Sequence, residues 1–219
     1  MWSEIGTGEN KIYLSLVWHS FMVRKVVVIG MGYVGIPAAA LFADVPSFTV
    51  VGVQGRSKRS SWKIDWLNEG KNPIGGDEPG LSELIARVVK KGTFKVIEDI
   101  STCKDADAIL IAVQTPTDAA KRPRYESLKE VSQQIGRYMR AGTLVVIEST
   151  VAPGTTDNLV KPILEESSGM KAGKDFFLAF CYERVMVGRL IKNIVQLPRI
   201  MGESTRKARG VPWNCTCTS

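Results

Sequence analysis

Histidine and cysteine are scarce in this sequence, which limits the kinds of site that it can build. The 219 residues include one histidine and four cysteines, at positions Cys103, Cys181, Cys215 and Cys217. Cysteines spread in this way do not form the disulfide framework that small secreted domains need. The pair Cys215 and Cys217 resembles the start of a metal motif but lacks a second pair of ligands. We therefore expect free thiols and no metal site.

Long apolar runs are also missing. No segment approaches the roughly 20 apolar residues that a membrane-spanning helix needs. The first twenty residues do not resemble a secretory signal, because Glu4 and Glu9 precede the apolar patch and no small-residue cleavage site follows it. We expect a cytoplasmic protein that has no membrane partner.

The charge is unbalanced, with a net value of +7. Such a charge suits a nucleic acid, a membrane surface or a small polyanion. The lysines and arginines are scattered, however, and no aromatic side chains alternate with them as in a base-stacking surface. We expect no nucleic-acid partner. The charge indicates either an ordinary solvated surface or help in holding an anionic cofactor and substrate.

The most informative stretch is a β-branched run that ends in the pattern GxGxxG, at residues 26–35. Small and apolar residues typical of a buried helix follow it. Gly30 permits a tight turn, Gly32 lets the backbone approach a pyrophosphate, and Gly35 lets the helix pack closely on the strand. The stretch predicts a dinucleotide site. The alternative is a glycine-rich turn that only packs a strand–helix–strand unit.

Two further features belong to this predicted dinucleotide site. The N–H groups at the helix start, around Tyr33 and Val34, would face the phosphates with the positive end of the helix dipole behind them. The strand predicted at 48–53 ends at Gln54, where this fold normally places an acid that holds the adenosine ribose. Gln54 can still bond a ribose hydroxyl. Because the acid that would repel a 2′-phosphate is missing and Arg56 is nearby, NADP stays open beside NAD.

Apolar segments alternate with helical patterns along the chain. We predict strands at 26–29, 48–53, 94–97, 108–113, 143–148, 175–180 and 199–202, and helices at 36–43, 62–68, 81–91, 125–140 and 156–166. This alternation predicts an α/β fold of the Rossmann type, a doubly wound and mostly parallel sheet with strand order near 3-2-1-4-5-6. The domain should span 23–203, after an extension at 1–22 and before an atypical tail at 204–219.

Polar residues follow two of the buried strands. Thr115 comes after the strand at 108–113, and Thr150 comes after the strand at 143–148. A doubly wound sheet places its ligand contacts at this edge. Thr115 could cap its strand end, but the topology favours a contact with the nicotinamide end of a dinucleotide.

With these motifs the sequence resembles a known family. It is similar to the amino-terminal, NAD-binding domain of the nucleotide-sugar dehydrogenases that oxidise a UDP-sugar at C6 to a uronic acid, the UDP-glucose and UDP-N-acetyl-D-mannosamine 6-dehydrogenases. The matching motifs are Val28 to Pro37, Glu78-Pro79-Gly80-Leu81, Gln114-Thr115-Pro116-Thr117, Gly142 to Val151, Pro153 to Thr156, and Glu183-Arg184-Val185. Residues 54–57 and 183–189 resemble the N-acetylmannosamine branch more than the glucose branch.

The resemblance implies an oxidation in two hydride transfers to NAD, with a cysteine that forms a thioester which water then hydrolyses. It implies that Thr150 lies at the cofactor and positions that water, and that Glu183 is a carboxylate near the thioester, within reach to act as a base. The residues themselves leave two alternatives open, a Thr150 that caps a helix and a Glu183 paired with Arg184. The resemblance also favours NAD over NADP, despite Gln54.

The sequence departs from the family in its second half. Family members continue with a central helix and a second domain that carries the nucleophilic cysteine and the UDP site, and Cys215 and Cys217 lack the context of that cysteine. We therefore expect a chain that binds NAD but is inactive alone. It should bind a UDP-sugar only together with a second domain, and a homodimer stays open. The alternatives are a UDP-glucose 6-dehydrogenase fragment and a non-catalytic module that senses a dinucleotide.

Overall fold

The computed structural model describes residues 25–55 and 60–203. The predicted extension at 1–22, the tail at 204–219 and Arg56 lie outside the described residues. The helical elements are α2 (Gly35–Asp44), α3 (Ser61–Asn68), α4 (Leu81–Lys90), η1 (Ile100–Asp105), α5 (Glu126–Tyr138), η2 (Thr156–Val160), α6 (Lys161–Ser168) and α7 (Leu190–Gln196). The strands are β1 (Lys25–Ile29), β2 (Thr49–Val53), β3 (Phe94–Ile97), β4 (Ala108–Ile111), β5 (Leu144–Ile147), β6 (Phe177–Phe180) and β7 (Gly202–Glu203).

One sheet organises the described residues, with strand order β3-β2-β1-β4-β5-β6-β7. The first six strands of this order are parallel to their neighbours, which confirms the predicted fold class and the order 3-2-1-4-5-6. The last strand differs from the prediction at 199–202. β7 begins only at Gly202 and pairs antiparallel with β6, so that Phe180 lies opposite Gly202.

β1 lies in the middle of the sheet and is buried on both faces. Its neighbours are β2 and β4. Val26 and Val28 belong to one hydrophobic cluster, while Val27 and Ile29 belong to a second cluster across the sheet. A strand that is covered on both sides has no polar face, which explains the uninterrupted β-branched run in the sequence.

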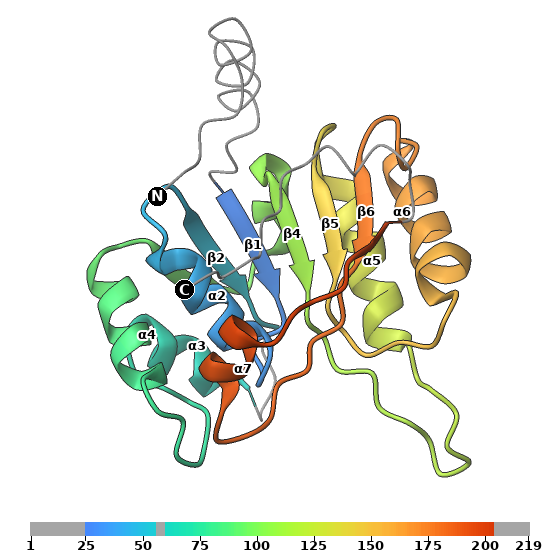
Figure 1. Ribbon diagram of the computed structural model, residues 1–219. Coiled ribbons are helices and arrows are strands. Elements are labelled where there is room, and N and C mark those ends of the chain that lie inside the picture. Colours follow the sequence, from blue (N-terminus) through green and yellow to red (C-terminus); the bar gives the residue numbers. More distant parts are fainter. Residues whose placement is uncertain (1–24, 56–59, 204–219) are drawn as a thin grey trace, which may run out of the picture.

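Helices cover the two faces of the sheet, as Figure 1 shows. Residues of α2, α3, α4 and α7 pack into the first cluster, and residues of η1, α5 and α6 pack into the second. The sequence patterns did not predict α7, a short helix in which Leu190 alone is fully buried. The helix predicted at 156–166 begins as a π-helical turn, η2, before α6 continues it.

An exposed ion pair joins the end of α2 to α4. The Arg87 guanidinium donates from Nε to Asp44 Oδ1 at 3.1 Å and from Nη2 to Oδ2 at 2.8 Å, and Lys91 Nζ donates to Oδ1 at 2.8 Å. Hydrogen bonds from Arg87, and then from Lys91, hold the pKa of Asp44 well below its usual range. The two-point contact is a geometrically specific link between the end of α2 and α4.

We predict that Asp44→Asn lowers the free energy of unfolding by about 0.5–1 kcal/mol at pH 7, since the pair is partly exposed to solvent. Because the folded-state pKa is depressed, this contribution is complete above the unfolded-state pKa of about 3.9 and is lost as the pH falls toward the folded-state value. Urea unfolding of both proteins between pH 7 and pH 3 should therefore show a difference that shrinks below about pH 4. Asp65→Asn, an exposed position on α3, is the control. A difference that does not depend on pH would contradict the prediction.

Candidate functional site

A cavity of about 460 Å³ lies along the carboxyl edge of the sheet. It is lined by loops that follow four strands and by one side chain of α3: Gly32, Tyr33, Val34, Lys63, Ala112, Val113, Gln114, Thr115, Pro116, Glu148, Ser149, Thr150 and Glu183. In Figure 1 the ends of β1, β4 and β5 point toward this edge. The strand order reverses between β1 and β4. Ligands of doubly wound sheets bind at that position.

The loop after β1 turns sharply at Gly30. Its φ is +102°, and a Cβ atom there would lie 2.5 Å from the carbonyl oxygen of Ala112. A Cβ at Gly35 would lie 1.9 Å from the carbonyl oxygen of Gly30. By contrast, a Cβ at Gly32 would have no protein atom within 4 Å. Two of the glycines are thus required by the fold, whereas Gly32 faces the cavity without being needed for packing.

Gln54 supports the glycine loop and does not line the cavity. Its Oε1 accepts a hydrogen bond from the N–H of Met31 at 3.0 Å, and its Nε2 donates to the Gly55 carbonyl at 3.2 Å. The predicted contact of Gln54 with a ribose remains a prediction. Because the amide oxygen and one N–H of the amide already make hydrogen bonds, the second N–H is the group that this residue can offer to a ligand.

Thr115 and Thr150 lie together, as the topology predicts. Thr115 Oγ1 donates a hydrogen bond to the carbonyl oxygen of Thr150 at 2.7 Å. Close by, Ser149 Oγ donates to the Val113 carbonyl at 2.7 Å. These two bonds tie the loop after β4 to the loop after β5. The Thr115 hydroxyl therefore connects two strand ends, a role that differs from capping its own strand.

Three charged side chains form a buried cluster in the wall of the cavity, the carboxylate–guanidinium cluster of Glu148, Glu183 and Arg199. Arg199 Nη2 donates to Glu148 Oε1 at 2.7 Å and lies 3.1 Å from Glu183 Oε2. The side chains of the two glutamates are 2% and 3% exposed, and that of Arg199 is 10% exposed. Burial raises the pKa of the Glu148 carboxyl, the Arg199 cation opposes this rise and the Glu183 carboxylate adds to it.

The hydrogen bonding of this cluster is incomplete. Glu148 Oε2, Glu183 Oε2 and Arg199 Nε are buried and make no hydrogen bond within residues 25–55 and 60–203, although Glu183 Oε2 is in ion-pair contact with Arg199. Buried polar atoms that lack hydrogen bonds are costly, and they tend to occur at functional sites. The cluster therefore belongs to the site and not only to the core.

The alternative partner considered for Glu183 does not hold. Glu183 Oε1 accepts a hydrogen bond from the backbone N–H of Arg184 at 2.7 Å, but its carboxylate pairs with Arg199. The Arg184 guanidinium lies 5.7 Å from the centre of the Tyr182 ring. Arg199 and Glu148 were missed as site residues because the fold alone brings them together from distant segments.

Lys63 is a further cavity residue that the sequence patterns did not indicate. It lies on α3, and its Nζ donates to the carbonyl oxygen of Met31 at 3.4 Å. This places an ammonium group beside Gly32, Tyr33 and Val34 at the same cavity. A lysine in a partly exposed helix has many ordinary explanations, so no signal in the sequence distinguishes it.

Of the described cysteines, Cys103 does not supply an activated thiol. Burial raises the pKa of Cys103 to about 12. Cys181 is also buried, and its carbonyl oxygen accepts a hydrogen bond from Arg199 at 3.3 Å. Within the described part of the chain no group of three or more His, Cys, Asp or Glu residues is arranged to hold a metal ion. None of the helices there is long and apolar enough to cross a membrane.

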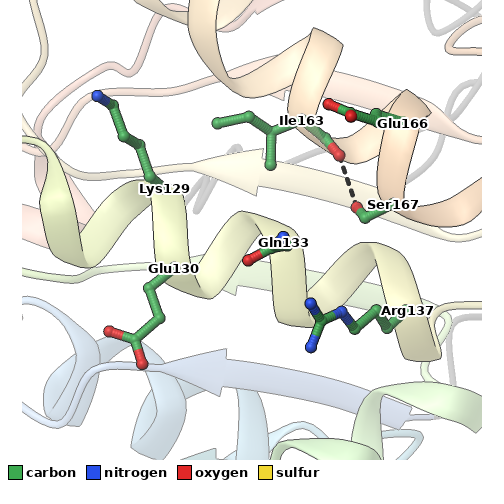
Figure 2. Close-up of a pocket in the computed structure, with 7 residues that line it drawn as sticks. All are labelled: Lys129, Glu130, Gln133, Arg137, Ile163, Glu166 and Ser167. Carbon is green, nitrogen blue, oxygen red and sulfur yellow. Dashed lines mark hydrogen bonds between the residues drawn. The ribbon is translucent and has the colours of Figure 1, made fainter.

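A second hollow, of about 410 Å³, lies between α5 and α6. Figure 2 shows the residues that line it, Lys129, Glu130, Gln133 and Arg137 on α5 and Ile163, Glu166 and Ser167 on α6. Its only marked contact joins Ser167 Oγ to the carbonyl oxygen of Ile163, at 2.6 Å. None of the residues that line this hollow belongs to a sequence motif, and all of them are distant in sequence from the glycine loop.

Comparison with known proteins agrees with the motifs. Residues 24–212 match the NAD-binding domain of the UDP-glucose/GDP-mannose dehydrogenase family. A UDP-N-acetyl-D-mannosamine dehydrogenase of Pyrococcus horikoshii is 35% identical over 184 residues, which cover 84% of this chain and 42% of the relative. A UDP-N-acetyl-D-mannosamine dehydrogenase of Campylobacter jejuni is 36% identical over 191 residues, which cover 84% of this chain and 44% of the relative.

A solved structure is more similar still. The crystal structure of an NDP-N-acetyl-D-galactosaminuronic acid dehydrogenase from Methanosarcina mazei matches with a TM-score of 0.82 and 50% identity, over 87% of this chain and 41% of that one. The chain thus spans about two-fifths of the length of the relatives that it matches. On the family match, the confirmed strand order and the motifs gathered at one cavity, this chain belongs to the UDP-glucose/GDP-mannose dehydrogenase family, of which it contains the NAD-binding domain.

Proposed function

We propose that the chain binds NAD at the cavity on the carboxyl edge of the sheet and supplies the cofactor half of a nucleotide-sugar 6-dehydrogenase. The observation that supports the proposal is that motif residues from separate parts of the sequence meet at one cavity. Gly32, Thr115, Thr150 and Glu183 lie far apart in the sequence and line one cavity at the topological switch point. A glycine turn that only packed a strand–helix–strand unit would not need the other three residues around it.

The residues at the cavity fit this cofactor. The space above Gly32 is one that a Cβ would enter, and it lies at the start of α2, where backbone N–H groups and the helix dipole favour a pyrophosphate. Lys63 would add a cation on the same side. Thr115 and Thr150 would meet the nicotinamide end. When bound, NAD⁺ supplies the hydride acceptor for alcohol oxidation.

The residues at the far side of the cavity suit the chemistry of the second half of the reaction. The Glu183 carboxylate lines the cavity, where it could accept a proton from a bound water. Thr150 lies exposed on the same wall and could orient that water. In this proposal neither residue acts as the nucleophile.

The proposed substrate is a nucleotide-linked N-acetylhexosamine, bound together with a second domain. The relatives named above act on UDP-N-acetyl-D-mannosamine or carry the name of an N-acetyl-D-galactosaminuronic acid enzyme. UDP-N-acetyl-D-mannosamine is the substrate that the sequence motifs favour. UDP-glucose remains the alternative within the family. A non-catalytic dinucleotide sensor would leave the buried carboxylates at the cavity without a purpose, so we do not favour it.

We predict that NADH binds more tightly than NADPH, and that Gln54→Asp widens the difference by about tenfold or more, because a carboxylate repels the 2′-phosphate. Titration of each dinucleotide by fluorescence or calorimetry measures both affinities. Gln114→Asp is the matched control, since it adds the same charge in another loop of the cavity and should weaken both dinucleotides alike. Tighter binding of NADPH by the unaltered chain would refute this cofactor assignment.

The glycines allow a separate prediction about the binding site. Gly32→Ala should leave the free energy of unfolding within about 0.5 kcal/mol of its original value, because the added methyl group meets no protein atom. It should weaken NADH binding by about tenfold or more, because the methyl group occupies the approach of the pyrophosphate. Gly35→Ala is the contrasting variant, with an expected loss of about 1–3 kcal/mol of stability from overpacking. Unchanged NADH affinity in Gly32→Ala would place the cofactor elsewhere.

A further inference from the structure

The carboxylate–guanidinium cluster contains two negative groups and one positive group. Arg199 Nη2 donates a hydrogen bond to Glu148 Oε1 at 2.7 Å and to the Cys181 carbonyl oxygen at 3.3 Å. The same nitrogen lies 3.1 Å from Glu183 Oε2. Two buried carboxylates that face each other without a cation could not both stay ionised at low cost. The positions of both glutamates therefore depend on a single guanidinium.

Arg199 lies in the segment between β6 and β7, and contacts on both sides of it hold this segment in place. The carboxylate of Glu78, itself buried, accepts hydrogen bonds from the N–H groups of Gly188 and Leu190 and so holds the start of α7. β7 then pairs with β6 at Phe180 and Gly202. Because the segment is anchored before and after Arg199, the guanidinium has little freedom to follow Glu183 if that side chain moves.

Buried ion clusters are poor sources of stability, because the cost of removing charges from water offsets their attraction. Well-packed apolar residues would fill the same space at no such cost. In this cluster both carboxylates also line the cavity, and Glu148 Oε2 has no hydrogen-bond partner in the described chain. A role in placing carboxylates at the cavity therefore explains the cluster more simply than a contribution to the stability of the core.

We propose that Arg199 is a positioning residue, whose guanidinium holds the Glu183 carboxylate at the cavity wall while it balances the charge of Glu148. This inference rests on the role proposed above for Glu183. Arg199 does not line the cavity and touches no reacting atom, so it acts only through the two glutamates. Through its ion pair with Glu183, Arg199 orients that carboxylate toward the cavity, where a water molecule would react.

The test uses Glu148 as a reporter, since the charged groups that act on it are Arg199 and Glu183. Carbon-13 NMR of labelled glutamate side chains, in the chain without dinucleotide, follows its titration. Arg199→Met should raise the midpoint for Glu148 by about one pH unit or more, and Arg199→Lys should restore most of the original value. Glu183→Gln should lower the midpoint, because it removes the neighbouring negative charge. Arg189→Met removes an exposed arginine of the same segment and should change nothing.

A second signal reports on the orientation of Glu183. The amide of Arg184 donates to Glu183 Oε1, so its proton resonance should move in Arg199→Met and stay in place in Arg189→Met. A purely structural Arg199 would lower the melting temperature of its variants without moving the Arg184 amide, because Glu183 would keep its orientation without the guanidinium. An unmoved midpoint in Glu183→Gln would overturn the proposal even if Arg199→Met fails to fold. Because no dinucleotide is present, this outcome is independent of whether NADH binds.

Discussion

The close approach of backbone to backbone at the end of β1 is the constraint on which the rest of the site depends. Gly30 passes so near the carbonyl of Ala112, and Gly35 so near the carbonyl of Gly30, that neither position has room for a Cβ atom. These contacts hold the start of α2 against the ends of β1 and β4. They therefore create the edge at which the strand order reverses, and with it the place of the cavity.

A second level of organisation ties the other loops to this edge. The hydroxyl of Thr115 bonds the loop of Thr150, and Arg199 draws Glu148 and Glu183 together from the ends of β5 and β6. These polar contacts thus join the ends of neighbouring strands, first β4 to β5 and then β5 to β6. Packing places the loops, and hydrogen bonds then fix the side chains that face the proposed cofactor and the reacting water.

Much of the fold could be predicted from the sequence because strongly periodic segments dominate it. The apolar stripe of α4 is buried as its spacing indicates, at Leu81, Leu84, Ile85 and Val88. α7 escaped prediction because it is short and buries little, and the last strand was misplaced because two residues of pairing leave no pattern. Both elements are held by contacts with distant parts of the chain, so the local sequence pattern does not reveal them.

The site was predictable in part, from polar residues at strand ends and from the family motifs, although Glu148 at the end of β5 was missed. Thr115 and Thr150 were found because each comes just after a buried strand, and Glu183 was found through the family resemblance; the structure brings all three to one cavity. Lys63 and Arg199 reach the site from a helix and from a connecting segment, so only the fold reveals them.

The central claim is that the cavity at the switch point holds the dinucleotide. Mapping NADH-induced shifts of the backbone amides by nitrogen-15 NMR tests it directly. The account predicts that the largest shifts fall at Gly32 to Val34, at Gln114 and Thr115, and at Ser149 and Thr150, which line that cavity. Shifts centred instead on the hollow between α5 and α6, around Gln133 and Ser167, would contradict it.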